Sequence, residues 1–212
     1  DEFKDVKVLA VHVHGPGNIY TAKKQIKTMA DIKGLKLRGP TRLTTKLLAS
    51  MGATPVGMPV PAVPDALSKG VIDGCVIPWE VVPSVKVHEL TQFHSEFDPK
   101  GGALYTTTFV MAMNRRKYDG LPPDLKKIID ANPGINTSAF LGRVQQSGDA
   151  PARKQAVDRG NKINSIGLAE SQEFRRRARQ VEVEWIQDMD KRGFNGRDLI
   201  NTARALIEKH SK

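Results

Sequence analysis

The feature that most constrains this chain is the run of residues 31–80, in which short apolar segments alternate with helix-like segments. Arg38 ends one apolar segment, before a helix expected over residues 41–51 that Thr41 can cap. In an open α/β sheet, ligands bind beyond the carboxyl ends of the strands. A guanidinium there is a permanently charged, two-pronged donor that suits a carboxylate. The run therefore predicts an α/β fold whose sheet edge holds an organic acid.

Apolar, β-rich segments elsewhere extend the pattern. Strands are expected over residues 6–14, 33–38, 54–58, 73–77, 88–97 and 103–114. Gly15-Pro16-Gly17 is interpreted as a turn. After residue 114 the pattern is almost entirely helical, and Pro151 predicts a kink or break within it. Strands and helices that alternate at the start of the chain favour a sheet with parallel crossovers.

The net charge of +10 raises nucleic acid as a partner, but the charge is spread evenly. Residues 1–149 carry 19 basic and 14 acidic side chains, and residues 150–212 carry 14 and 9. The densest basic cluster, at residues 175–179, lies on the polar side of an amphipathic helical pattern. We therefore expect no nucleic-acid partner. A basic nucleic-acid-binding module is the weakest of three functional alternatives.

Motifs for catalysis or metal binding are not evident. His12 and His14 share a strand face, but no Cys, Asp or Glu accompanies them with ligand spacing. Cys75 is the single cysteine, which excludes an internal disulfide. No catalytic residue, metal or cofactor is predicted. A small enzyme acting on an organic acid through Asp73, Glu80 or a histidine is the second alternative.

Four short motifs occur in a fixed order along the chain. They are TMADIKGLKLR at residues 28–38, GATPV at 52–56, ALSKGVIDG at 66–74 and LPPD at 121–124. Together they resemble the solute-binding subunit of tripartite ATP-independent periplasmic (TRAP) transporters, the family named for C4-dicarboxylate binding. The resemblance covers essentially the whole chain.

The resemblance implies a periplasmic binding protein-like fold of type II, with two lobes that close over an organic acid. It implies no enzymatic activity, a location in the periplasm, and delivery of the acid to a membrane permease. The expected division places the substrate-binding lobe at residues 15–107. Residues 1–14 and 108–150 would form the hinge strands and the remainder of the other lobe, and residues 151–212 would be C-terminal helices packing across the lobes.

By the same resemblance, Arg38 matches the carboxylate clamp of the family. Trp79 and Thr106 match positions on the pocket wall, and Pro78 turns the chain at the sheet edge. Glu80 could pair with Arg38 or cap the following helical turn, which is expected over residues 81–86.

Asn18 and His14 complete the predicted set of ligand-binding residues. Sialic-acid-binding relatives carry an arginine at the position of Asn18 and an asparagine at that of Ile77. The pocket is therefore expected to be less polar than theirs, which favours a small oxo-acid or an aromatic monocarboxylate.

The chain begins partway through the family pattern. We therefore expect one nearly complete lobe, and another that lacks its opening strands. Exposed apolar patches usually find a partner. This expectation predicts a possible dimer through the truncated lobe.

Overall fold

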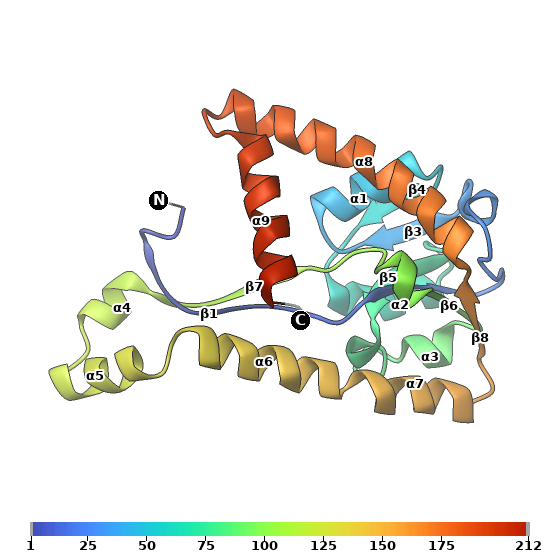
Figure 1. Ribbon diagram of the computed structural model, residues 1–212. Helices are drawn as coiled ribbons and strands as arrows, with labels where there is room; N and C mark the ends of the chain where they lie inside the picture. The colour runs from blue at the N-terminus through green and yellow to red at the C-terminus, as the bar shows by residue number, and fades with distance from the viewer. Residues whose placement is uncertain (1, 211–212) are drawn as a thin grey trace.

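The computed structural model describes residues 2–210 (Figure 1). The strands are β1 (Val6–Val13), β2 (Gly17–Thr21), β3 (Lys36–Gly39), β4 (Thr54–Gly57), β5 (Gly74–Pro78), β6 (Phe93–Phe97), β7 (Thr108–Asn114) and β8 (Lys162–Ile166). The α-helices are α1 (Arg42–Ser50), α2 (Val63–Ser68), α3 (Val87–Leu90), α4 (Arg115–Asp119), α5 (Pro123–Ala131), α6 (Ile135–Ser147), α7 (Asp149–Asp158), α8 (Leu168–Lys191) and α9 (Gly196–His210). Short 3₁₀ helices are η1 (Met29–Ile32), η2 (Val60–Ala62), η3 (Trp79–Val81) and η4 (Pro99–Gly101).

Six strands form one sheet in the order β4-β3-β5-β2-β6-β8. Strand β3 runs parallel to β4 and β5, and β6 runs parallel to β8, whereas β2 is antiparallel to both of its neighbours. Every residue of β2 and β5 is buried, as expected for central strands covered on both faces. We call this sheet, with the helices packed on it, the sheet lobe (residues 17–101 and 149–191).

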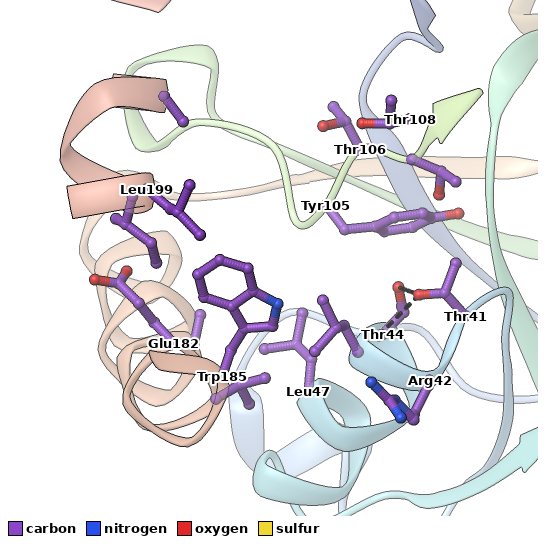
Figure 2. Close-up of a pocket in the computed structure, with 16 residues that line it drawn as sticks. Thr41, Arg42, Thr44, Leu47, Tyr105, Thr106, Thr108, Glu182, Trp185 and Leu199 are labelled. Carbon is purple, nitrogen blue, oxygen red and sulfur yellow. Dashed lines mark hydrogen bonds between the residues drawn. The ribbon is translucent and has the colours of Figure 1, made fainter. Parts of the chain in front are cut away.

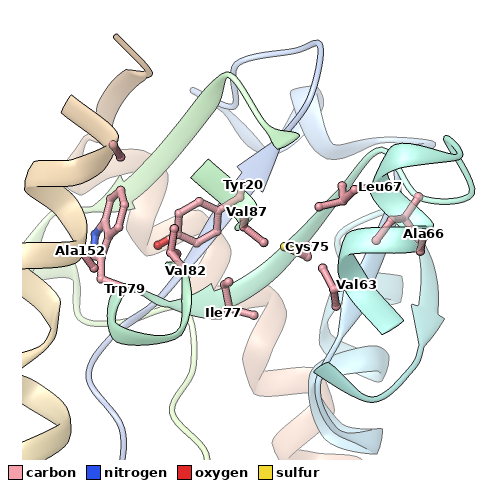
Figure 3. Close-up of a cluster of buried hydrophobic side chains, with 12 residues drawn as sticks. Tyr20, Val63, Ala66, Leu67, Cys75, Ile77, Trp79, Val82, Val87 and Ala152 are labelled. Carbon is pink, nitrogen blue, oxygen red and sulfur yellow. The ribbon is translucent and has the colours of Figure 1, made fainter. Parts of the chain in front are cut away.

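The core of the sheet lobe has two apolar layers, one on each face of the sheet. Side chains alternate between the faces along each strand. Tyr20, Cys75 and Ile77 therefore face α2, α3 and α7 (Figure 3), whereas Ile19 and Val76 face α1 and α8. This packing fixes the register of the strands and the positions of their carboxyl ends.

The remaining pair of strands, β1 and β7, forms a long antiparallel ribbon from Val6↔Asn114 to Val13↔Thr108. Helix α6 lies along β1, where Ser138 Oγ accepts a hydrogen bond from the Val11 backbone N–H at 3.1 Å. We call β1, β7 and α4–α6 the ribbon arm (residues 6–13 and 108–147); Figure 1 shows it extending away from the sheet lobe. The chain passes between the two regions at residues 14–16, at residues 102–107 and at Gly148.

The α/β class predicted from the sequence is confirmed, but several boundaries were wrong. Gly17 begins β2, a strand that the Gly-Pro-Gly pattern concealed. The segment expected as a strand over residues 88–97 begins instead with α3, and in the other long segment the strand starts only at Thr108. The helical turn expected over residues 81–86 begins earlier, with η3 at Trp79.

The C-terminal third is not purely helical, because β8 joins the sheet beside β6. The helix break falls at Gly148, and Pro151 lies in the first turn of α7, where no backbone N–H is required. Within residues 2–210, no helix is both long enough and apolar enough to cross a membrane.

Candidate functional site

Arg38 lies near the carboxyl end of β3 and is only 2% exposed. Its Nε donates to the Met58 carbonyl at 3.0 Å, and Nη1 donates to the Val76 carbonyl at 3.4 Å. Burial lowers the pKa of the guanidinium. Among residues 2–210, no carboxylate forms an ion pair with it. A buried cation is costly unless an anion compensates it, so the position suits an anionic ligand.

The parallel strands around Arg38 explain its position. Arg38 pairs with Val56 of β4 and Cys75 of β5, so the carboxyl ends of three strands meet at one edge of the sheet. A side chain at Gly39 would come within 2.9 Å of Thr45 Oγ1. The glycine thus lets α1 begin immediately beside the guanidinium.

His14 and Asn18 lie at the same edge, and both side chains satisfy the backbone. The His14 Nδ1–H donates to the Gly15 carbonyl at 2.5 Å, while Nε2 accepts from the Thr107 N–H at 3.1 Å. Burial lowers the pKa of His14, which favours this neutral ring. The Asn18 amide donates to the Pro16 carbonyl at 3.3 Å. Ligand contact by either residue stays a prediction.

Glu80 and Asp149 bring two carboxyl groups together where α7 meets η3. Asp149 Oδ1 accepts a hydrogen bond from the Glu80 backbone N–H at 3.1 Å. Burial, with a contribution from Asp149, raises the pKa of Glu80 to about 7. Glu80 forms no ion pair with Arg38 here. At pH values well below 7 the Glu80 carboxyl is therefore mostly protonated and carries little negative charge.

Trp79 lies in the core, on the Tyr20 face of the sheet (Figure 3). Its ring is in edge contact with Tyr20 and His94 at centroid distances of 5.2 and 5.4 Å. The indole N–H donates to Glu96 Oε1 at 2.9 Å, and Arg153 of α7 also binds Glu96, at 2.7 and 3.0 Å. Pro78, just before it, ends β5 and is buried opposite Gly17. The proposed role of both residues in a pocket wall stays a prediction.

A cavity of about 730 Å³ opens beside this edge (Figure 2). Its walls come from the start of α1, the segment of residues 105–108, and helices α8 and α9. The lining residues include Thr41, Thr44, Leu47, Tyr105, Thr106, Glu182, Trp185 and Leu199. Of the residues predicted for the site, Thr106 lines this cavity, whereas Arg38, Trp79 and Glu80 do not.

Tyr105 is a residue of the site that the sequence interpretation missed. It lines the cavity, is half-buried, and lies close enough to Arg38 for the guanidinium to oppose the rise in phenol pKa that burial causes. The sequence offered only a weak signal, one aromatic residue between two glycines and three threonines.

No group of three or more His, Cys, Asp or Glu side chains that could hold a metal ion occurs in the part of the chain that the structure describes. The arrangement therefore consists of one buried cation, a neutral histidine, a carboxyl pair and an apolar cavity. These groups can bind an organic anion through charge and shape.

Comparison with known proteins gives consistent relationships along the chain. The family model described as bacterial extracellular solute-binding protein, family 7, matches residues 2–188. The 2,3-diketo-L-gulonate-binding periplasmic protein YiaO of Escherichia coli is 26% identical over 98% of this chain and 55% of the relative.

Two solved structures are more similar. A TRAP solute-binding protein from Rhodoferax ferrireducens, in complex with copurified benzoate, is 66% identical, with a TM-score of 0.97. A marine metagenome TRAP protein specific for aromatic acid ligands, in complex with metahydroxyphenylacetate, is 47% identical, with a TM-score of 0.94. Each comparison covers 100% of this chain and 66% of the solved one. The chain thus spans between about half and two thirds of the length of these relatives.

Proposed function

The chain belongs to the bacterial extracellular solute-binding proteins of family 7, and we propose that it binds a small organic acid for a TRAP transporter. In this proposal the protein works in the periplasm and delivers the acid to the membrane permease. The observation that carries it is Arg38, a guanidinium that is 2% exposed and forms no ion pair with a carboxylate within residues 2–210.

An aromatic monocarboxylate is the ligand class we favour. The relatives at 66% and 47% identity hold benzoate and metahydroxyphenylacetate, respectively. Apolar side chains such as Leu47 and Trp185 line much of the cavity, which suits an unsubstituted ring better than a polyhydroxylated chain. The oxo-acid alternative, which the less polar pocket also favours, is supported among these relatives by a 2,3-diketo-L-gulonate-binding protein at only 26% identity.

The chemistry we propose is capture and release without a reaction. The carboxylate would replace water on Arg38 and accept charge-assisted hydrogen bonds from its free N–H groups. Thr106 at the cavity and the neutral form of Glu80 would complete surroundings that do not repel an anion. Two lobes would close on the acid, with residues 15–107 forming the one that carries Arg38.

The decisive experiment is titration calorimetry with benzoate on the longest natural protein that contains this chain. Arg38→Ala should weaken binding by about 2–5 kcal/mol, because it removes the partner of a desolvated carboxylate. Arg38→Lys should restore only part of that loss, since it lacks the paired fork. Arg115→Ala is the matched control, because Arg115 donates to the Val6 carbonyl in the ribbon arm.

Unchanged affinity in Arg38→Ala would refute the site. Consumption of the acid during the titration would favour the enzyme alternative. Steeply salt-dependent retention on DNA would favour a nucleic-acid-binding module.

A further inference from the structure

Tyr105 lies in the segment that connects η4 to β7 and is held there by Gly17 and His14. Its carbonyl accepts a hydrogen bond from the Gly17 N–H at 3.0 Å. Its ring lies directly on Gly17, where an added Cβ would come within 2.1 Å of the ring. Any side chain at position 17 would displace the phenol. The glycine is therefore required here by space, since its φ is not positive.

His14 fixes the ring from a second side. Its imidazole meets the Tyr105 ring edge-on, with a centroid distance of 5.3 Å and an interplanar angle of 82°. The imidazole is itself locked by the Gly15 carbonyl and the Thr107 N–H, at 2.5 and 3.1 Å. Gly17 and His14 thus hold the Tyr105 ring from two sides, and neither contact requires a ligand.

The fixed ring lines the open cavity and lies near the buried cation. Figure 2 shows the Tyr105 side chain extending over Thr41 and Thr44 along one wall. Arg38 and Tyr105 are near enough to influence one another electrostatically. Burial keeps the phenol neutral, so it offers an apolar face and a hydroxyl donor without adding charge.

We infer that Tyr105 is the residue that selects aromatic acids: its ring provides the flat contact for an aryl group whose carboxylate is held by Arg38. His14 is a positioning residue that acts through Tyr105. This inference rests on the proposed function. Trp79 is not available for this task, because Glu96 binds its indole N–H and Tyr20 and His94 enclose its ring.

The test compares benzoate with cyclohexanecarboxylate, which has the same charge and nearly the same size but no aromatic ring. Dissociation constants are measured by calorimetry on the longest natural protein containing the chain. Tyr105→Leu should weaken benzoate binding about tenfold and change cyclohexanecarboxylate binding less than about twofold. Tyr105→Phe should keep the preference for benzoate over cyclohexanecarboxylate, and His14→Ala should reduce this preference. Phe140→Leu, which removes an exposed aromatic side chain from α6 of the ribbon arm, away from the cavity, should leave the preference for benzoate unchanged.

Equal weakening of both acids in Tyr105→Leu, or weakening of neither, would overturn the inference. Arg38→Ala tests the proposed function separately, because this variant should lose affinity for both acids. The failure of the proposed function can therefore be told apart from the failure of this inference about Tyr105. A second measurement covers the case in which Tyr105→Leu does not fold. If the Tyr105 ring contacts the ligand, saturation of tyrosine ring protons in an otherwise deuterated protein should transfer to bound benzoate. This transfer should disappear in Tyr105→Phe with its phenylalanines deuterated, and its persistence there would equally refute the assignment.

Discussion

The sheet lobe and the ribbon arm use apolar residues in opposite ways. In the sheet lobe, every residue of β2 and β5 is buried, and helices α1, α2, α7 and α8 each contribute buried side chains. In the ribbon arm, β7 and helices α4–α6 contain no buried residue, and Ala10 is the buried one in β1. Phe140 and Ile135 of α6 are 56% and 82% exposed.

The sheet lobe and the ribbon arm are stabilised by different interactions. The sheet lobe is stabilised by its own core, whereas the arm depends on backbone pairing between β1 and β7 and on the contact of α6 with β1. Hydrophobic burial is the main favourable contribution to folding. We therefore expect the two regions to differ in stability and in their response to mutation.

The largest difference should appear when a phenylalanine is removed from each region. Phe174 of α8 is 2% exposed and packs edge-on against Phe97, so Phe174→Ala should lower the free energy of unfolding by about 3–5 kcal/mol. Phe140→Ala should change it by no more than about 0.5 kcal/mol. Urea unfolding of the 212-residue chain measures both. If both substitutions lowered the free energy of unfolding by similar amounts, the apolar surface of the arm would have to be covered in solution. Light scattering should then detect the expected dimer.

A smaller effect concerns Glu80, at the junction of the two regions. Its pKa is raised from 4.5 to about 7, so the folded state binds more protons than the unfolded state between these values. The stability associated with Glu80 is therefore full below about pH 4.5 and is lost as the pH rises through about 7. Glu80→Gln should be more stable than the parent at pH 8 by about 1–3 kcal/mol, with the gap closing towards pH 5.

Asp130 of the arm provides the control for that experiment. Hydrogen bonds from Lys7 and Tyr118 lower its pKa below 3.8, so it does not titrate between pH 5 and 8. Asp130→Asn should thus leave the slope of stability against pH in that window unchanged. Equal slopes of stability against pH in the parent and in Glu80→Gln, between pH 5 and 8, would contradict the assignment to Glu80.

The smallest expected effect compares two helix N-caps. Thr41 Oγ1 accepts from the Thr44 N–H of α1, and Asn114 Oδ1 accepts from the Lys117 N–H of α4, both at 3.2 Å. Thr41→Ala should lower the free energy of unfolding by about 1 kcal/mol, because α1 is part of the cooperative core. Asn114→Ala should only accelerate amide exchange within α4, since that helix opens locally. If both Thr41→Ala and Asn114→Ala lowered the urea midpoint, the arm and the lobe would unfold together.

Much of the sheet lobe followed from local sequence patterns. The segment around Arg38 showed both its strand and the Thr41 cap, and the α/β class and the solute-binding family are both confirmed. Strand β8 escaped prediction because KINSI carries few apolar residues and lies among long helical patterns. Its pairing with β6 is a long-range contact that no local pattern indicates.

The site was harder to predict than the fold, because neighbours in space decide what each side chain does. Trp79 was expected at a pocket wall, yet Glu96, seventeen residues later, holds its indole N–H. The Glu80 side chain was expected to pair with Arg38 or cap a helical turn, whereas the Glu80 backbone N–H donates to Asp149 of α7 and no ion pair with Arg38 forms. Tyr105 was overlooked because its position depends on the space left by Gly17.

The three chain passages between the arm and the lobe are joined to one another. Thr107 binds His14, Tyr105 binds Gly17, and the Asp149 carboxylate leaves no room for a side chain on Gly15. Three tethers fastened at one place behave mechanically as a pivot. Sliding or twisting the arm would stretch several tethers at once, whereas rotation about the line through them requires only small changes in a few backbone torsions. We therefore expect the arm to move against the lobe chiefly by rotation about these three passages.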